Sequence, residues 1–385
     1  MNSLNILVVD DHPLQLKQIS YQLNALNVKN VQCVTSGEAA LEALSARAFD
    51  LLFCDLNMPG MDGVELLSQV AEQGFKGRVV LVSAMENAII SSVRWMCEAL
   101  ELSVAGVLEK PFREQVLRQL VQSCAYQCVD SSTTKPKIQV SDEEFLFALA
   151  SGQVINHYQP KVDFNTQQLV GVEALARWQH PNYGVLYPDT FLPIVERCGL
   201  QNELFNTVML NVIDAINTQQ LPCATAINVT HNELEQPRFS ESFLSLCREH
   251  GISPSMITLE LTETEVYRDS SNLYRNLARL RLNHVGLAID DFGTGYSSLS
   301  KLSQLPFTEM KIDRSFIQMF RTNAKHTHIV ASICELAKRM EIQLVAEGVE
   351  DETTWFSLKS LGVDVCQGYF TGRPMDIQAL NQQYL

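Results

Sequence analysis

The stretch Val285-Gly-Leu-Ala-Ile-Asp-Asp-Phe-Gly-Thr-Gly-Tyr-Ser-Ser-Leu299 decides the fold, because an apolar run ends there in two carboxylates and a glycine-rich turn. Residues 285–289 are short, apolar and bounded by turn residues, as expected of a strand buried on both faces. Side chains alternate along a strand, so Asp290 and Asp291 can share one site only if the strand ends there. The stretch predicts a buried strand that places two carboxylates at the start of a loop. An acidic turn before a helix N-terminus is the alternative.

Seven more strand-like segments accompany this one in the C-terminal part of the chain. Residues 154–162 and 169–178 are separated by a gap too short for a parallel crossover, so they should form an antiparallel hairpin. The other strands alternate regularly with helical stretches and cover residues 224–229, 257–261, 286–290, 309–312, 343–346 and 364–367. Eight such strands predict a (β/α)8-type barrel in which one strand is antiparallel.

A polar residue lies at or near the end of every predicted barrel strand. These residues are Gln159, Glu173, Asn228, Glu260, Asp290, Lys311, Glu347 and Gln367. Barrel interiors are normally apolar and catalysis occurs at the C-terminal mouth of the strands. Each buried charge costs several kcal/mol unless it is paired or bound to metal, so a divalent metal site is predicted there.

The oxygen-only ligand set favours Mg²⁺ or Mn²⁺ over Zn²⁺. It consists of Glu173, Asn228, Glu260, Asp290 and Asp291. Two ions about 4 Å apart would clamp an attacking water and a phosphodiester oxygen.

Other polar residues suit acid–base or binding roles. Glu347 and Glu350 can supply a second-metal ligand and a base for the water. Lys311 can hold that water or stabilise negative charge, with a salt bridge to Asp313 as the alternative. Phosphate and base contacts are expected from Arg177 and Gln159.

The first 123 residues show a second α/β pattern. Apolar runs alternate with helical patterns at residues 6–9, 31–34, 51–54, 79–82 and 106–108. They predict a doubly wound five-strand parallel sheet. The residues at the C-terminal edge of this sheet, where such sheets bind ligands, are Asp10, Asp11, Asp55, Ser83 and Lys110. Three carboxylates there can hold a divalent cation, and Lys110 can neutralise a phosphoryl group on one of them.

A polar segment without apolar periodicity separates the two patterns, and it reads as a linker over residues 126–140. A capping-box sequence from Ser141 to Glu144 then begins a new helix. The expected domains are therefore residues 1–125 and 141–385.

Composition restricts the class of protein further. Apolar residues make up 46% of the 385 residues, and no apolar run approaches the roughly 18 needed to span a membrane. The N-terminus has no basic flank, so a cytoplasmic location is expected. A net charge of −15 argues against binding nucleic acid. The ten scattered cysteines suggest neither a zinc site nor a disulfide framework.

Three N-terminal motifs resemble the receiver domain of two-component response regulators. They are Val8-Val-Asp-Asp-His-Pro13, Cys54-Asp-Leu-Asn-Met-Pro-Gly-Met-Asp-Gly63 and Lys110-Pro-Phe112. The resemblance implies that Asp55 accepts a phosphoryl group, that Asp10 and Asp11 bind Mg²⁺, and that Ser83 and Lys110 contact the phosphoryl group. It also implies a sensor histidine kinase or phosphotransfer protein as partner. Val107 stands where the family has a switch aromatic.

The C-terminal motifs resemble the EAL family of cyclic di-GMP phosphodiesterases over about residues 141–385. The motifs are Glu173-Ala-Leu-Ala-Arg-Trp178, Asn228-Val-Thr, Leu259-Glu-Leu-Thr-Glu-Thr264, the 290–299 stretch, Lys311-Ile-Asp313, Glu347-Gly-Val-Glu350 and Gln367-Gly-Tyr-Phe370. The resemblance implies metal-dependent hydrolysis of cyclic di-GMP to the linear dinucleotide pGpG, with the metal ligands named above. It makes Glu347 the base or a second-metal ligand, supported by Lys311, Glu350 and Gln367.

The same resemblance implies that Glu263 anchors the loop at residues 292–299. It also implies a homo-oligomer, either a dimer or a tetramer.

The rival interpretation is a non-catalytic module that binds cyclic di-GMP or acts by protein contact. A transcription factor is not expected, because only eighteen residues follow Gln367.

Overall fold

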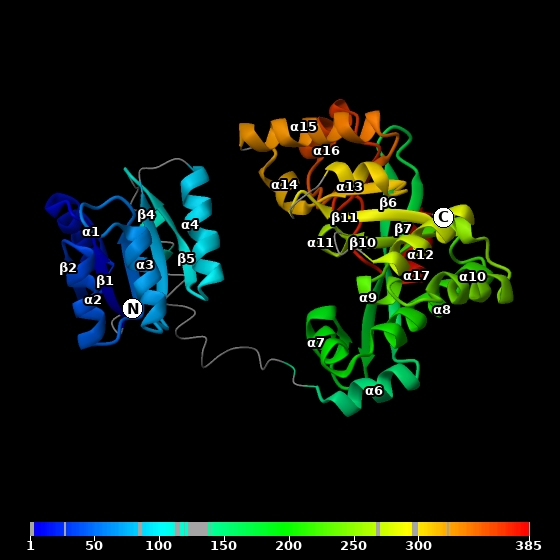
Figure 1. The fold of residues 1–385 in the computed structure, drawn as a ribbon, viewed down its shortest axis with the longest axis horizontal. Coiled ribbons are helices and arrows are strands. Elements are labelled where there is room, and N and C mark those ends of the chain that lie inside the picture. The colour runs from blue at the N-terminus through cyan, green and yellow to red at the C-terminus, as the bar shows by residue number, and fades with distance from the viewer. Residues whose placement is uncertain are drawn as a thin grey trace. The chain divides into compact units, whose positions relative to one another are not determined.

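The computed structural model describes residues 4–26, 28–83, 87–111, 116–118, 120–121, 138, 140–266, 270–294, 299–321 and 323–384. The chain divides into two compact units, Met1–Lys137 and Ile138–Leu385, which are coloured blue to cyan and green to red (Figure 1).

The N-terminal unit is a parallel sheet covered by helices. Its strands are β1 (Asn5–Val9), β2 (Asn30–Val34), β3 (Leu51–Asp55), β4 (Arg78–Ser83) and β5 (Ser103–Glu109). They pair in the order β2-β1-β3-β4-β5, and every pairing is parallel. The predicted five-strand sheet is therefore confirmed.

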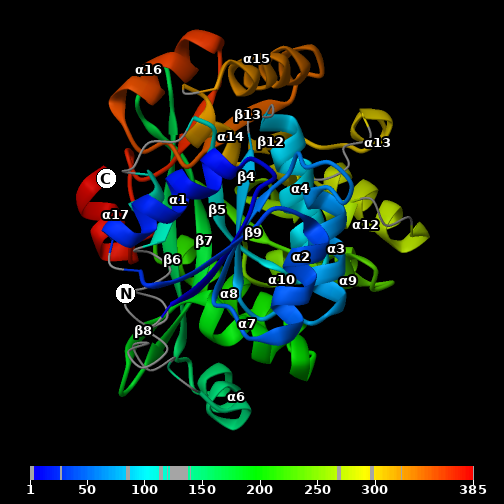
Figure 2. The ribbon, with the colours of Figure 1, turned by 90° about the vertical axis from the view of Figure 1, so that its left-hand side faces the viewer.

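Helices pack on both faces of this sheet. They are α1 (Pro13–Ala25), α2 (Gly37–Ala46), α3 (Gly63–Glu72) and α4 (Asn87–Ala99). Alternate residues of β1 point to opposite sides: Ile6 packs in the core beneath α1, and Leu7 packs in the core beneath α2, α3 and α4. Figure 2 shows α1 on one side of the strands and the pair α2 and α3 on the other. This double winding brings the C-terminal ends of the strands to one open edge.

The C-terminal unit is a closed barrel. Its strands are β6 (Val154–Asp163), β7 (Leu169–His180), β8 (Gly184–Leu186), β9 (Ala224–Asn228), β10 (Ile257–Thr262), β11 (Gly286–Phe292), β12 (Glu309–Ile312), β13 (Gln343–Glu347) and β14 (Val365–Gln367). The pairing order is β6-β14-β13-β12-β11-β10-β9-β7-β8, and pairing of β6 with β7 closes the ring. β6 is antiparallel to both of its neighbours, as predicted. The three-residue β8 was not predicted. It pairs with the C-terminal end of β7 as an antiparallel strand.

Helices surround the barrel. They are α6 (Asp142–Ala150), α7 (Pro188–Cys198), α8 (Gln201–Asn217), α9 (His231–Leu234), α10 (Phe239–Glu249), α11 (Glu263–Val266), α12 (Ser271–Leu282), α13 (Leu299–Gln304), α14 (Arg314–Met319), α15 (Ala324–Arg339), α16 (Glu352–Leu361) and α17 (Ile377–Tyr384), with a 3-10 turn at Pro254–Met256.

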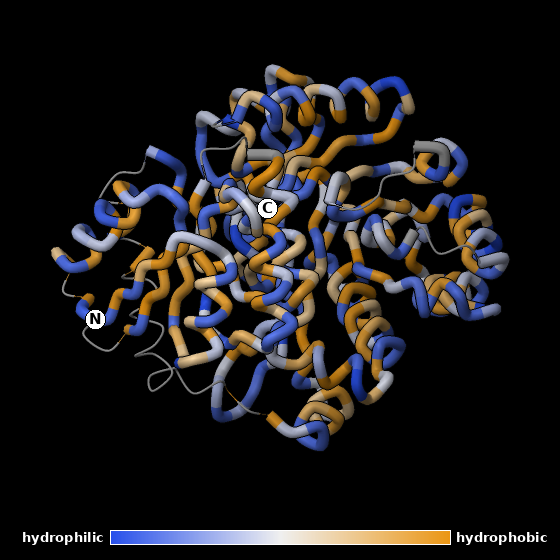
Figure 3. The backbone as a smooth tube through the Cα atoms, turned by 60° about the vertical axis from the view of Figure 1, so that its left-hand side comes forward, coloured by the Kyte–Doolittle hydropathy of each residue, from blue (hydrophilic) through white to orange (hydrophobic). Residues whose placement is uncertain are grey.

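The covering helices are amphipathic, as α8 illustrates. Its buried residues include Phe205, Val208, Met209 and Val212, at the spacing of one helix face. Hydrophobic and hydrophilic residues alternate along the helices in both units (Figure 3). The predicted capping box at Ser141 and Glu144 is present at the start of α6.

The described helices give no sign of a membrane span: each is too short or too polar to cross a bilayer.

Strand β11 corrects one expectation. The strand does not end at Asp290 but continues to Phe292, and its register against β12 shifts between Ile289 and Phe292. Asp291 has a left-handed φ of 54°, which aspartate tolerates better than most residues. Such a bulge inserts an extra residue and re-aims the side chains. The two adjacent carboxylates therefore reach one site through a bulge and not through the end of the strand.

Candidate active site

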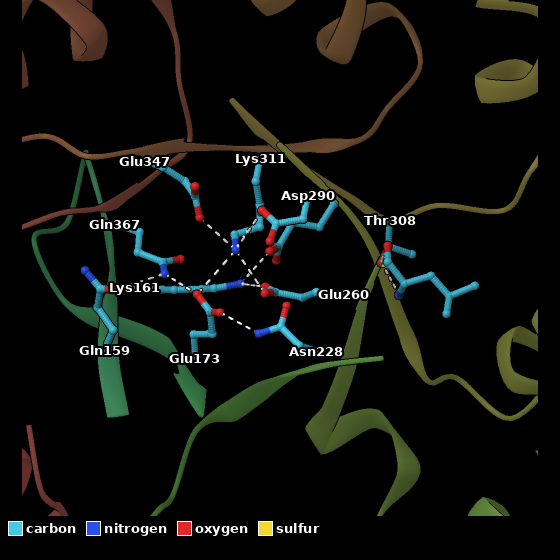
Figure 4. Close-up of polar contacts among 12 residues, drawn as sticks. Gln159, Lys161, Glu173, Asn228, Glu260, Asp290, Thr308, Lys311, Glu347 and Gln367 are labelled. Atoms are coloured by element: carbon cyan, nitrogen blue, oxygen red, sulfur yellow. Dashed lines mark hydrogen bonds and ion pairs between the residues drawn. The ribbon is translucent and has the colours of Figure 1, made fainter. Parts of the chain in front are cut away.

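A buried lysine lies at the centre of the barrel mouth. Lys311, on β12, is only 1% exposed. Its Nζ atom lies 2.7 Å from Glu347 Oε1, 2.9 Å from Glu260 Oε2, 3.0 Å from Asp290 Oδ1 and 3.3 Å from Glu173 Oε2 (Figure 4). Five strands thus bring one ammonium and four carboxylates together.

The alternative partner of Lys311 is engaged elsewhere. Asp313 caps α14, where its Oδ1 atom accepts a hydrogen bond of 2.9 Å from Ser315 N. The lysine therefore belongs to the carboxylate cluster.

Amide side chains fix the carboxylate of Glu173. Asn228 Nδ2 donates to Oε1 at 2.8 Å, and Gln367 Nε2 donates to Oε2 at 2.5 Å. Gln367 Nε2 also lies 3.4 Å from Gln159 Oε1. Residues from β6, β7, β9 and β14 therefore meet on one side of the mouth, as the strand-end pattern predicted.

A second buried lysine was missed by the sequence analysis. Lys161 on β6 is 4% exposed, and its Nζ atom lies 2.8 Å from Glu260 Oε1 and 2.5 Å from Glu309 Oε1. Its spacing from Gln159 is a usable signal, because residues two apart on a strand face the same way. Both oxygens of Glu260 therefore contact an ammonium. Although burial opposes ionisation, Lys161 and Lys311 lower the pKa of Glu260 to about 2.

The remaining carboxylates carry more negative charge than the lysines balance. Burial, reinforced by neighbouring carboxylates, raises the pKa of Glu173 and Asp290, and raises the pKa of Glu347 to about 8. Burial also raises the pKa of Asp291. Such a set needs either protons or further cations to be stable.

A metal ion fits one part of this set. Asp290, Asp291 and Glu347 each offer an oxygen, and the three oxygens lie within 4.8 Å of one another. Carboxylate oxygens are ligands of hard divalent cations. The site can therefore hold a metal ion. Of the other predicted ligands, Glu173 and Glu260 contact Lys311, and Asn228 donates to Glu173.

The turn after β11 is anchored. Buried Glu263 accepts a hydrogen bond of 2.8 Å from Gly293 N through its Oε2 atom. Gly293 has a φ of 103°, a conformation that glycine adopts readily. Of the loop at residues 292–299, positions 295–298, which include Gly295 and Tyr296, lie outside the described residues.

A pocket of about 170 Å³ opens beside the cluster. It is lined by Gln159, Glu173, Leu175, Arg314, Glu347, Gly348, Glu350, Gln367, Gly368 and Tyr369. Gly348 has a φ of 67°, and a Cβ there would lie 2.2 Å from Arg314 Cγ, so only glycine leaves room for that arginine.

Arg314 and Tyr369 form the outer wall of the pocket and were not predicted. Arg314 Nη2 lies 2.6 Å from Glu350 Oε1, and the guanidinium carbon lies 5.7 Å from the centre of the Tyr369 ring. Arg373 covers the same ring at 3.9 Å. Glu350 thus pairs with an arginine at the pocket and does not contact Lys311.

Arg177 lies apart from the pocket lining. It is buried on β7, donates to Ala176 O at 2.7 Å and stacks 5.1 Å from the ring of Tyr187.

The N-terminal unit brings its predicted residues to one edge. Lys110 Nζ lies 2.8 Å from Asp10 Oδ2 and 2.7 Å from Asp55 Oδ2. Burial raises the pKa of Asp55 against the opposing effect of Lys110. Asp10, Asp11 and His12 offer atoms within 4.8 Å of one another, which could hold a metal ion.

Two more predicted positions lie near this edge. Ser83 is buried at the end of β4, and its carbonyl accepts a hydrogen bond of 2.8 Å from Lys110 N. Half-buried Val107, at the position of the family's switch aromatic, packs against the core beneath α2, α3 and α4.

Two family models match the chain. The EAL domain model matches residues 142–374, and the response regulator receiver domain model matches residues 6–122. The chain is 33% identical to the cyclic di-GMP phosphodiesterase RocR of Pseudomonas aeruginosa over 98% of both chains. It is 36% identical to the bifunctional diguanylate cyclase/cyclic di-GMP phosphodiesterase MucR of the same organism, over 60% of this chain and 35% of MucR.

Solved structures show the same likeness. A structure of the MucR phosphodiesterase in complex with cyclic di-GMP has 36% identity and a TM-score of 0.58, and covers 62% of this chain and 98% of that chain. An EAL domain protein from Listeria monocytogenes has 28% identity and a TM-score of 0.59, and covers 64% of this chain and 98% of that chain.

Proposed function

The chain belongs to the EAL domain family and carries a response regulator receiver domain, and from this premise we propose that it hydrolyses cyclic di-GMP to the linear dinucleotide pGpG. The observation that carries the proposal is the ring of four carboxylates around Lys311. Two of them, Asp290 and Glu347, also form a possible metal site with Asp291. We take residues 1–125 as the receiver, 126–140 as a linker and 141–385 as the phosphodiesterase domain.

Divalent cations are part of the proposal, with Mg²⁺ or Mn²⁺ as the ions. Two ions are expected in the barrel, held by Glu173, Asn228, Glu260, Asp290, Asp291 and, as a further ligand or the base, Glu347. When bound, such ions polarise phosphoryl oxygens and lower the pKa of water.

Glu347 is the proposed general base. It lines the pocket and its Oε1 atom contacts Lys311, so it lies between the substrate and the charge cluster. In the reaction Glu347 accepts a proton from the attacking water while the water oxygen bonds to phosphorus. One ester P–O bond breaks and its oxygen takes up the proton that Glu347 accepted, while the buried ammonium of Lys311 offsets the negative charge that develops.

The pocket walls suit a guanine nucleotide. Gln159 and Gln367 present amides that can bind base edges, and Tyr369 presents a ring on which a base can stack. Arg314 can bind a phosphate oxygen, and Glu350 holds it at the rim. Arg177, on the same face of β7 as Glu173, contacts a part of the substrate that extends beyond the pocket lining in this proposal.

The receiver is the proposed control element. Asp55 is its phosphoacceptor, Asp10 and Asp11 hold Mg²⁺, and Ser83 and Lys110 contact the phosphoryl group. A sensor histidine kinase or phosphotransfer protein supplies that group. We also propose a homo-oligomer, a dimer or a tetramer, as the assembly in which the signal reaches the barrel.

Chromatography of the products after incubation of the full chain with cyclic di-GMP and Mg²⁺ tests the proposal. The expected product is pGpG, and addition of a chelator should stop its formation. Saturable binding of cyclic di-GMP without any product would instead support the non-catalytic module.

A further inference from the structure

The pair of Lys161 and Glu309 lies one layer below the proposed catalytic cluster. Lys161 is two residues beyond Gln159 on β6, and because β6 runs antiparallel it reaches deeper into the barrel. Glu309 precedes Lys311 by two residues on β12 and faces the same way. Figure 4 shows the ammonium of Lys161 beside Glu260.

Glu260 is held from two sides by different lysines. Its Oε2 atom lies 2.9 Å from Lys311, which also contacts three other carboxylates. Its Oε1 atom lies 2.8 Å from Lys161 Nζ, and the same ammonium lies 2.5 Å from Glu309 Oε1. Two contacts on different oxygens fix both the position and the rotation of the carboxylate.

A purely structural role is the alternative for the buried pair. Barrel layers are normally filled by branched apolar side chains, and such residues often replace a buried ion pair without loss of stability. Apolar residues would not supply a hydrogen-bond donor to Glu260 Oε1, the oxygen that Lys161 contacts. Partners that orient a metal ligand in this way typically matter tenfold to a hundredfold for metal affinity.

We propose that Lys161 is a positioning residue: by holding Oε1 of Glu260 it fixes Oε2, which also contacts Lys311, in the position of a ligand for the divalent cation. This inference rests on the proposed metal-dependent function. Glu309 pairs with the same Lys161 ammonium, at 2.5 Å from its Oε1 atom. Strand β6, which carries Lys161 and runs antiparallel to its neighbours, therefore contributes to metal binding from inside the barrel.

The test compares Lys161→Met, Glu309→Gln and the double variant Lys161→Met/Glu309→Met in the full chain. Each also carries Asp10→Asn and Asp11→Asn, so that the receiver edge does not bind the metal. Mn²⁺ affinity is measured by calorimetry and Tm by thermal denaturation, against the chain with the receiver changes alone. Turnover at rising Mn²⁺ gives a third measurement.

We expect Mn²⁺ affinity to fall about tenfold or more in Lys161→Met and in the double variant, and to stay within twofold in Glu309→Gln. Tm should fall in Lys161→Met, which leaves Glu309 buried without its cation, and should recover in the double variant. The KM for cyclic di-GMP at saturating Mn²⁺ should change less than twofold, because Lys161 does not line the pocket.

Equal losses of affinity in Glu309→Gln and Lys161→Met would overturn the proposal, as would reference affinity in the double variant. Either result would show that Lys161 and Glu309 form a structural ion pair without a role in metal binding. Absence of turnover in the reference chain would count against the phosphodiesterase assignment, while the calorimetric comparison would still decide the role of Lys161.

Discussion

Glu347 is the residue on which the proposed chemistry depends most directly, since it contacts Lys311 and lines the pocket. Replacing Glu347 with Ala should lower turnover of cyclic di-GMP at least a hundredfold, because general base catalysis typically contributes that much. Binding of cyclic di-GMP should remain measurable, because loss of a base affects the transition state more than the ground state.

Kinetics measures the turnover of cyclic di-GMP, and calorimetry on the same preparations measures its binding. Glu352→Gln, on an exposed carboxylate of α16, is the matched control and should behave as wild type. If Glu347→Ala keeps turnover within tenfold of wild type, which is about 1.4 kcal/mol of barrier, Glu347 is not the base.

Arg314 provides a second prediction at this scale. Replacing it with Gln should raise the KM for cyclic di-GMP roughly tenfold and leave kcat within about threefold, as loss of one charge-assisted hydrogen bond of about 1.5 kcal/mol predicts. The matched control is Arg321→Gln, which removes an arginine that is equally exposed and pairs with Asp351 at 3.5 Å, outside the pocket lining. An unchanged KM for Arg314→Gln would remove this arginine from the substrate site.

Single residues were predictable where they follow an apolar run and were missed elsewhere. Glu173, Asp290 and Glu347 follow apolar runs, so chain pattern alone brings them to the mouth. Lys161 lies within a strand and Glu309 at the start of one. A charged residue at such a position is interpreted as a surface residue until the positions of the neighbouring strands are known. Arg314 was missed because its contact with the pocket depends on space left by Gly348.

At the scale of elements, β11 shows what periodicity leaves out. The apolar run predicted the strand and the two carboxylates, but not the bulge that lets both face one site. A bulge depends on the register with β12, which is a property of two strands and not of one sequence segment. The brief β8 was missed for a related reason, since three residues carry too little pattern.

The first turn of α9 contains a carboxyl group that should make stability depend on pH. Glu233 is 2% exposed and accepts a hydrogen bond of 2.6 Å from Thr230 N. Burial raises its pKa to about 7 from 4.5, with a smaller contribution from Glu265. The folded state therefore holds this proton more tightly than the unfolded state, and wild type should lose stability as pH rises from about 4.5 to about 7.

Replacing Glu233 with Gln removes the titration but keeps an oxygen for Thr230 N. Its free energy of unfolding relative to wild type should rise by on the order of 2 kcal/mol between pH 5 and pH 8. Urea denaturation at both pH values measures this difference, with exposed Glu203→Gln as control. A difference that stays constant, or falls, would show that Glu233 titrates normally.

At the scale of the whole molecule, both units were predictable as folds because each carries motifs at the ends of its strands. We propose that the two halves communicate, through Asp55 in one and the loop after Asp291 in the other. Phosphorylation adds charge and acceptor oxygens beside Lys110, which already contacts Asp55 at 2.7 Å. In this proposal the changed receiver surface biases the loop that Glu263 anchors.

We expect a small-molecule phosphodonor to raise turnover of cyclic di-GMP at least twofold in wild type and to have no effect on Asp55→Asn. Turnover with and without the donor, in both proteins at one Mg²⁺ concentration, measures the effect. The same response in both proteins, or none in either, would refute the coupling and leave the enzyme assignment intact.

The central claim is that the carboxylates at the barrel mouth hold divalent metal ions for hydrolysis of cyclic di-GMP. Its most direct test is turnover by metal-free protein after return of Mg²⁺, Mn²⁺ or Ca²⁺, in wild type and in Asp290→Asn. We predict that Mg²⁺ and Mn²⁺ restore pGpG formation in wild type only, and that Ca²⁺ does not, because its longer and less regular coordination does not suit a two-metal clamp. Unchanged cyclic di-GMP with every metal, or full activity in Asp290→Asn, would contradict the claim.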